Sequence, residues 1–362
     1  MVEVDFLPAS SESKSGDSIL IRTGFFDYKY PVLNEQTVIL IDSGYQECAK
    51  TITNHLKKTY CTRKIDYVFI THPDEDHLSG LKEILIKNEI TIKHVYIHDP
   101  WKHVKTVFER SDDGRRTFNS VKCRMEKGFP LLSEVYELLD KKGISYDEIF
   151  SDEYVSLDKD YYIDILGPSK SFYEKLIFEY TESLNNASYS QQDVYQTGTS
   201  NAFFVKKYFV DNPCTSQKNE SSMILLLAKK KNNEPLCLFS GDAGVRAYLG
   251  AIHNIRQYHI PINGVPYVQL PHHGSIKNVQ EWFFNIFKKS SFVVSASSGE
   301  IKKHPSPLLI NYICLKLGGS VYQATDSNGL QCSFDGTPNR PGWGTAPPKN
   351  YALRVHKLQG DE

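Results

Sequence analysis

The stretch VFITHPDEDHLSG, from Val68 to Gly80, places two histidines and three carboxylates within residues 72–77. The apolar run that leads into it, IDYVFI, predicts a buried strand, and LSGLKEILIKNE at its end has the spacing of a helix. A loop this acidic repels itself unless a positive charge is bound in it. Imidazole and carboxylate together are ligands for Zn²⁺ or Mn²⁺. The stretch therefore predicts a metal site at the end of a strand, and the alternative is a solvated acidic loop.

Length, composition and charge describe an ordinary folded chain. It has 362 residues, of which 40% are hydrophobic and 23% charged, which is enough for a sizeable core. The formal net charge of −1 gives no overall sign of a nucleic-acid-binding protein, so any such contact would come from local patches. No apolar run approaches the ~20 residues of a membrane span, and the N-terminus does not resemble a signal peptide. The seven cysteines are scattered and never form a C-x-x-C pair, which predicts reduced thiols in a cytoplasmic protein.

Strand and helix patterns alternate along the first third of the chain. Strands are predicted over residues 17–26, 36–44, 65–70 and 92–100, and helices over 46–60, 78–89 and 131–142. From residue 221 onward the strand pattern resumes, and each strand ends in a polar or glycine turn. This order predicts an α/β fold, with polar sites at the carboxyl ends of strands.

Three further polar clusters follow predicted strands. They are SGD with Asp242, PHHGS with His272 and His273, and KKHPSP with His304. Ligands on strand-end loops can converge while the strands keep them rigid. One loop can then serve two neighbouring ions, and a later carboxylate such as Asp242 can bridge them. The alternative for Asp242 is the N-cap of the helix that follows it.

At this point the chain resembles a known family. THPDEDHLSG is similar to the H-x-[HD]-x-D-H signature of the metallo-β-lactamase superfamily. Asp74, at the motif's third position, resembles the hydrolase domain of the competence protein ComEC and its soluble relatives. GDSILIRTG, VILIDSG, ESSMILLL, LFSGDAG, VQLPHHGS and SASSGEIKKHPSP resemble other pieces of that domain, in order, over about residues 16–335. Two departures from the family pattern stand out. EIKK stands where the family usually has an Asn and a Tyr-Gly before His-Pro. The further histidine ligand that the broader superfamily has upstream of the strand ending in Gly-Asp is absent here.

The resemblance implies a metallo-β-lactamase αββα sandwich, with two mixed β-sheets flanked by helices. The hydrolase domain would span residues 1–335, with insertions at about 101–130 and 183–215 that match no known piece. Residues 336–362 are rich in proline and glycine and are predicted to form a C-terminal tail.

The resemblance also implies two divalent ions, Zn²⁺ or Mn²⁺. The predicted ligands form two groups: His72, Asp74 and Asp242 for one ion, and Asp76, His77, Asp242 and His273 for the other. A carboxylate at position 74 hardens the site, so Mn²⁺ competes better with Zn²⁺. Asp42 either supports the metal loop from behind or makes a turn. Strand or rim positions, not ligand positions, are expected for His94, His98 and His103.

The residues expected to act in catalysis are Asp76, His272 and His304. His272 would protonate a leaving oxygen, although a packed histidine is the alternative, and the choice between His272 and His273 as ligand stays open. His304 would hold a phosphate oxygen, and the alternative is an ordinary basic surface loop. Further substrate-binding candidates are Ser275, Lys302 and Lys303.

The predicted function is that of a metal-dependent phosphodiesterase or nuclease, acting on DNA or RNA through a metal-bound hydroxide. One alternative is a hydrolase of small phosphoesters or cyclic nucleotides. Another is a metal-holding interaction protein of a multi-protein system, with the insertions in residues 101–215 as the docking surface for a protein partner.

Residues 101–130 allow two interpretations. They interleave basic side chains with the aromatic residues Trp101, Phe108, Phe118 and Phe129. A nucleic-acid platform would stack bases on these rings and contact phosphates through Arg115, Arg116, Lys122 and Arg124. The interpretation that we favour is a solvated helical insertion whose aromatic residues dock on the core.

Overall fold

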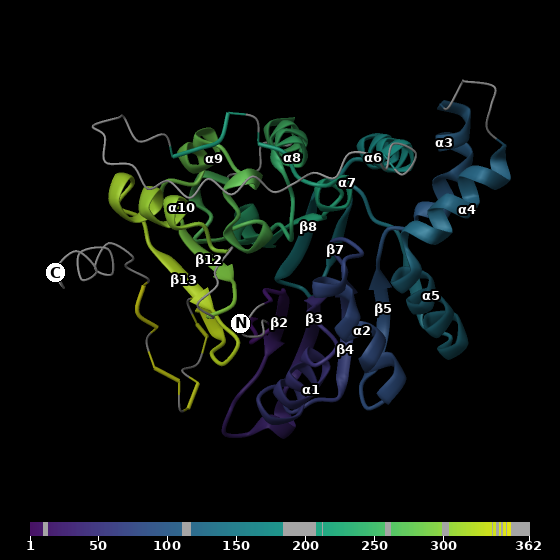
Figure 1. Ribbon diagram of the computed structural model, residues 1–362. Helices are drawn as coiled ribbons and strands as arrows, with labels where there is room; N and C mark the ends of the chain where they lie inside the picture. The colour runs from purple at the N-terminus through teal and green to yellow at the C-terminus, as the bar shows by residue number, and fades with distance from the viewer. Residues whose placement is uncertain are drawn as a thin grey trace, which may run out of the picture.

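Two seven-stranded β-sheets pack face to face, and helices cover the outer face of each (Figure 1). The predicted sandwich of two mixed sheets flanked by helices is confirmed. The computed structural model describes residues 1–9, 14–110, 117–183, 208–211, 213–257, 262–298, 304–334, 336–337, 340–341, 343–344 and 346–348.

The first sheet has the order β14-β1-β2-β3-β4-β5-β6. Strands β14, β1, β2 and β3 pair antiparallel, whereas β3, β4, β5 and β6 run parallel. The bounds are β1 Val2–Phe6, β2 Ser18–Phe25, β3 Glu35–Ser43, β4 Lys64–Phe69, β5 Thr91–Tyr96, β6 Ser145–Asp147 and β14 Leu330–Ser333.

The second sheet repeats this plan in the order β13-β12-β11-β10-β9-β8-β7. Strands β10 to β13 are parallel, and β7 to β10 pair antiparallel. The bounds are β7 Tyr154–Ser156, β8 Tyr161–Gly167, β9 Ile224–Lys229, β10 Glu234–Phe239, β11 Tyr267–Gln269, β12 Ser291–Ser295 and β13 Val321–Ala324. In both sheets the parallel strands end in loops on the same edge, where side chains from several loops can meet.

The helices divide between the two outer faces. Those that contribute to the core over the first sheet include α1 Cys48–Lys58, α2 Glu75–Lys87, α3 Val104–Arg110, α4 Phe118–Gly128, α5 Pro130–Lys142 and α6 Lys170–Ser183. Those over the second sheet include α8 Val245–Gln257, α9 Glu281–Ile286 and α10 Pro307–Asn311. The one-turn helix α7 Gln217–Glu220 precedes β9. No helix in the described ranges combines the length and apolarity that a bilayer crossing requires.

The central strands are apolar on both faces because both faces are buried. In β2, Ile19 and Ile21 point into the layer between the sheets, while Leu20 packs under the outer helices. In β9, Leu225 and Leu227 likewise face the middle layer. Continuous apolar runs are typical of strands covered on both sides.

Strand β1 is not predicted from the sequence, because Glu3 and Asp5 interrupt its apolar residues. All five of its residues are buried nevertheless. Arg22 of β2 and Arg340 pair with the two carboxylates, which makes their burial tolerable. Arg340 lies within the range predicted as a tail.

The insertion at residues 101–130 forms α3 and α4 at the edge of the molecule (Figure 1). Trp101 packs edge-on against Phe129 and Tyr136, with ring centroids 6.5 and 5.8 Å apart. Phe118 is more exposed and contacts Phe108. Residues 111–116, with Arg115 and Arg116, and residues 184–207 of the second insertion lie outside the described residues.

Candidate metal centre

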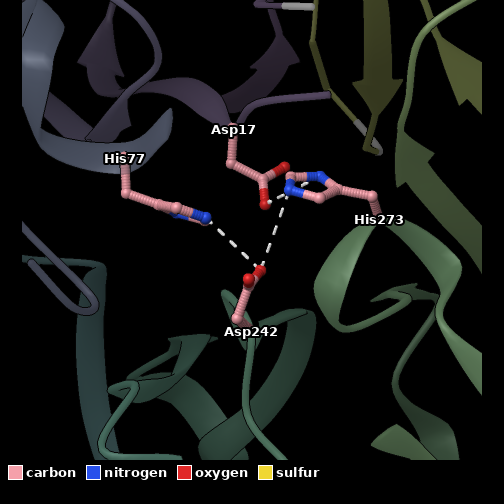
Figure 2. Close-up of side chains that lie close together, drawn as sticks. All are labelled: Asp17, His77, Asp242 and His273. Carbon is pink, nitrogen blue, oxygen red and sulfur yellow. Dashed lines mark ion pairs between the residues drawn. The ribbon is translucent and has the colours of Figure 1, made fainter. Parts of the chain in front are cut away.

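Side chains from both sheets meet where the parallel strands end. Asp42 lies in the last two residues of β3, His72 follows β4, Asp242 follows β10, and His272 and His273 follow β11. Figure 2 shows side chains from four segments that point toward one another: Asp17, His77, Asp242 and His273. One ligand atom from each of the four lies within 4.8 Å of all the others.

The carboxylate of Asp242 lies at the middle of this group. Its Oδ1 is 3.3 Å from His77 Nε2 and 3.9 Å from His273 Nε2. Its Oδ2 is 3.8 Å from His72 Nε2 and 3.5 Å from His272 Nε2. One carboxylate therefore faces two sets of imidazoles with its two oxygens, which is the arrangement expected of a bridging ligand.

The acidic loop supplies side chains to both sets. Asp76 Oδ2 is 3.1 Å from His273 Nε2 and 3.7 Å from His77 Nε2. Asp74 Oδ2 is 3.8 Å from His72 Nε2. The structure thus brings together the two groups of side chains that the sequence assigns to two ions. His273 lies beside Asp76 and Asp242 Oδ1, whereas His272 lies beside Asp242 Oδ2.

The loop and the helix after it explain why its side chains reach both sides of Asp242. Asp74 has an extended backbone and precedes α2, and its carbonyl accepts hydrogen bonds from the amides of His77 and Leu78. Asp76 and His77 therefore stand in the first helical turn, where adjacent side chains point in different directions. Gly80, one turn further on, donates a 2.9 Å hydrogen bond to the Gly44 carbonyl and holds the helix against the end of β3.

Three histidines, His72, His77 and His273, each have a polar contact at Nδ1, on the side of the ring away from Asp242. His77 Nδ1 donates to Asp42 Oδ2 at 2.8 Å, and His273 Nδ1 donates to the Ser295 carbonyl at 2.9 Å. His72 Nδ1 lies 3.2 Å from the hydroxyl of Ser222. A hydrogen on Nδ1 leaves the lone pair on Nε2, and in all three rings Nε2 faces the other ligands.

Several polar atoms of the centre are buried without a hydrogen-bond partner. Within the described chain, no hydrogen bond reaches His72 Nε2, His77 Nε2, Asp242 Oδ1 or either carboxylate oxygen of Asp17. An unpartnered buried polar group costs about 1–3 kcal/mol, and such groups gathered in one place need a ligand that satisfies them together. The donors are imidazole nitrogens and carboxylate oxygens, which fit a divalent ion such as Zn²⁺ or Mn²⁺.

Electrostatics in the centre favour a bound cation. Burial by itself would raise the pKa of Asp76, but His77 and His273 lower it to about 2. Burial would lower the pKa of His273, yet Asp17, Asp76 and Asp242 raise it to about 9. Neighbouring carboxylates likewise outweigh burial and raise the pKa of His77 well above its usual value. His77 and His273 thus stand in a strongly negative field, in which a bound cation would be stabilised.

The remaining predicted residues lie around this group. His272 has its Nδ1 3.1 Å from Asn278 Oδ1, and its ring centroid is 5.2 Å from that of His304. Ser275 is buried, and its hydroxyl accepts a hydrogen bond from the Lys277 amide. Lys302 and Lys303 lie outside the described residues.

Two residues of the centre are not predicted from the sequence. Asp17 is buried, with Oδ2 3.7 Å from His273 Nδ1, and burial raises its pKa. Asn219 donates to Asp242 Oδ2 at 3.2 Å and lies 3.3 Å from His272 Nδ1. A Gly-Asp-Ser tripeptide before a strand signals only a turn. The position of Asn219 depends on contacts between segments distant in sequence.

Part of the chain matches a known protein family. Residues 30–149 match the family model described as the metallo-beta-lactamase superfamily. The chain has the metallo-beta-lactamase fold. The matched range begins before β3 and ends after β6, so it includes the acidic loop. No curated protein matches the chain.

Solved structures with this fold are distant in sequence. A metallo hydrolase from the archaeon Ignicoccus hospitalis is 14% identical, with 92% of this chain and 100% of that chain covered and a TM-score of 0.41. A diphosphatase of the PhnP family is 11% identical, with 92% and 98% covered and a TM-score of 0.42. A long-form RNase Z from yeast is 11% identical, with 83% and 38% covered and a TM-score of 0.38. The finer resemblance to the ComEC branch stays a prediction.

Proposed function

We propose that this protein is a metal-dependent phosphodiesterase with two divalent ions, and that its substrate is DNA or RNA. The observation that carries the proposal is the set of buried Nε2 and carboxylate atoms that lack hydrogen bonds on the two sides of Asp242. A metallo-beta-lactamase fold with this donor set fits a metal-dependent hydrolase.

One ion would be held by His72, Asp74 and Asp242, and the other by Asp76, His77, Asp242 and His273. When bound, such ions act as Lewis acids and lower the pKa of water to about 7. Within this ligand set, the three aspartates offset three of the four positive charges of the two ions, and the ions themselves would attract an anionic phosphodiester. The additional carboxylate of Asp74 favours Mn²⁺ relative to sites built of histidine alone.

The chain's own residues orient these ligands and handle protons. Asp42 fixes the ring of His77, and the Ser295 carbonyl fixes that of His273. His272 is the most exposed of the four histidines that face Asp242, with 29% of its side chain accessible, so it can reach a substrate. It is therefore proposed as the acid that protonates the leaving oxygen, with His304 beside it.

The nucleic-acid part of the proposal draws on α4, where Lys122 and Lys127 are exposed. Exposed lysines on one element can contact the phosphates of a polymer, and such contacts make binding salt-dependent. The alternative is that the natural substrate is a small phosphoester. A test with both nucleic acids and a small phosphoester distinguishes the two.

The test is hydrolysis by the purified protein, loaded with Mn²⁺ or Zn²⁺. The substrates are single-stranded DNA, double-stranded DNA, RNA and bis-p-nitrophenyl phosphate. Asp76→Ala should lose metal and at least about 100-fold in kcat/KM, whereas the exposed Asp160→Ala should match the wild type. Asp76→Ala protein with full metal content and full activity contradicts the proposal. Cleavage of the small diester alone contradicts its nucleic-acid part.

A further inference from the structure

Lys218 of α7 lies beside the centre and is not used by the ligand set described above. Its Nζ is 3.6 Å from Asp74 Oδ1. In the described ranges it is the one lysine or arginine that forms an ion pair with an aspartate of the centre, these being Asp17, Asp42, Asp74, Asp76 and Asp242. A single cation at the rim of an otherwise acidic site calls for an explanation beyond charge balance.

Two aromatic rings hold the ammonium group in place. Nζ lies 4.9 Å from the ring centroid of Phe129 and 5.4 Å from that of Tyr180. The two rings are 5.1 Å apart, and the Tyr180 hydroxyl donates to the Gly128 carbonyl at 3.2 Å. Cation–π contacts on two sides restrict a side chain that would otherwise move freely in solvent.

The short helix that carries Lys218 is fixed at both ends. Ser216 caps it by accepting a hydrogen bond from the Asn219 amide. At its other end, the buried carboxylate of Glu220 accepts a 2.8 Å hydrogen bond from the Ala247 amide. The backbone of Lys218 is therefore placed by α7's contacts and not by the ion pair.

The ammonium group keeps its hydrogen-bond donors available. The 3.6 Å distance to Asp74 exceeds the 2.7–2.9 Å of a direct charge-assisted hydrogen bond. No acceptor among the described residues hydrogen-bonds Nζ, and 23% of the side chain is exposed. An ammonium group has three donors, so Lys218 can bind an anion that reaches the centre from solvent.

The adjacent pocket is too small for an aromatic group. His72, Phe129, Tyr180 and Lys218 all line it, and its cavity volume is about 10 Å³. That volume corresponds to about one water molecule, so a nucleobase does not fit between the rings. The two rings therefore serve to position the lysine.

We propose that Lys218 binds a non-bridging phosphoryl oxygen of the substrate on the Asp74 side of the centre. The proposal rests on the proposed phosphodiesterase function, and it adds a substrate-binding residue that lies outside the sequence motifs. Lys218 gives that side of the centre a fixed positive charge. This charge favours an anionic phosphoester over a neutral ester.

The experiment compares Lys218→Met, Lys218→Arg and the exposed control Lys175→Met on α6. The Mn²⁺ content of each protein is measured first. The affinity for inorganic phosphate is then measured on the Mn²⁺-loaded proteins by titration calorimetry, and KM and kcat are measured with bis-p-nitrophenyl phosphate.

Lys218→Met should keep its metal and bind phosphate about tenfold more weakly, with a matching rise in KM. Lys218→Arg should recover part of that affinity, and Lys175→Met should behave as the wild type. Unchanged phosphate affinity in Lys218→Met overturns the inference. So does a loss of metal with normal phosphate affinity in the loaded fraction, since Lys218 would then act only through Asp74. If the wild type cleaves no phosphodiester, the proposed function fails, while phosphate binding still tests Lys218.

Discussion

At the scale of single residues, the centre depends on what engages the far side of each histidine. Asp42 is the clearest case, because its carboxylate accepts hydrogen bonds from His77 Nδ1 and from both the amide and the hydroxyl of Thr71. It thereby fixes the His77 ring and the start of the acidic loop at once. Its backbone has a φ of 54°, a left-handed conformation that non-glycine residues adopt mainly where surrounding structure enforces it.

Asp42→Asn should weaken Mn²⁺ binding about 10- to 100-fold. Both Asp42 oxygens accept hydrogen bonds, so the NH₂ group of asparagine would face a donor of Thr71 or His77. One of these hydrogen bonds is then lost, and the His77 ring is held less firmly. Metal titration of the purified variant measures the change. Glu35→Gln, at the exposed start of the same strand, is the control, and equal affinity in the two variants would contradict the assigned role of Asp42.

His98 shows how a residue away from the centre sets a pH dependence. Its ring is buried, stacks on Phe150 and donates from Nε2 to the Ile149 carbonyl at 2.8 Å. Burial lowers its pKa from 6.5 to about 4. Between these values the unfolded chain binds a proton that the folded chain does not, so this contribution to stability is present above pH 6.5 and is lost as the pH falls to 4.

His98→Gln should therefore flatten the pH dependence of unfolding. The difference between wild type and variant over pH 6.5 to 4 should be about 3 kcal/mol in the free energy of unfolding. Urea unfolding at several pH values measures it, with the exposed His253→Gln as control. A slope in His98→Gln equal to that of the wild type would show that His98 does not titrate as stated.

At the scale of elements, α2 has to approach β3 closely for its first turn to reach the centre. Gly80 makes this approach feasible, because a Cβ at that position would lie 2.0 Å from the Ser43 carbonyl oxygen. The Ser43 hydroxyl also accepts from the Leu81 amide and donates to the His77 carbonyl, each at 2.8 Å. The helix and the strand end are thus locked together directly behind the predicted ligands.

Gly80→Ala should destabilise the protein by about 1–3 kcal/mol and weaken Mn²⁺ binding, because the helix must move away from β3. Gly250→Ala in α8 is the matched control. Its Cβ would meet nothing within 4 Å, and removal of a helical glycine should stabilise by about 0.5–1 kcal/mol. Urea midpoints and metal titration measure both effects, and wild-type values for Gly80→Ala would exclude the tight contact.

At the scale of the whole molecule, a buried ionic network joins the two ends of the described chain. Arg340 Nη2 donates to Glu3 Oε1 at 2.8 Å and to Asp5 Oδ2 at 2.7 Å. Burial would raise the pKa of Asp5, but His55 and Arg340 lower it to about 2. Arg340 therefore ties the segment after β14 to the first strand.

Arg340→Met should reduce the free energy of unfolding by about 3–5 kcal/mol, because it leaves two buried carboxylates short of a counter-charge. The denaturation midpoint measures this, with the exposed Arg63→Met as control. A midpoint within error of the wild type would indicate that the segment around Arg340 does not hold the first sheet.

Much of the fold follows from local sequence patterns. Apolar runs such as SILI and VILI predict the central strands, and their punctuation by Asp-Ser-Gly and Ser-Gly-Asp predicts where they end. The pattern fails for β1, whose carboxylates are tolerable in the core only because Arg22 and Arg340 arrive from elsewhere. Local propensity carries no information about such partners.

The sequence alone predicts a metal-binding loop after a buried strand, from the residue types and their spacing. The fold then places His273 3.1 Å from Asp76 and adds Asp17, Asn219 and Lys218, none of which the sequence pattern predicts. The physical reason is the order of strands in two packed sheets. That order brings segments nearly 200 residues apart within a few ångströms, as it does for Asp76 and His273.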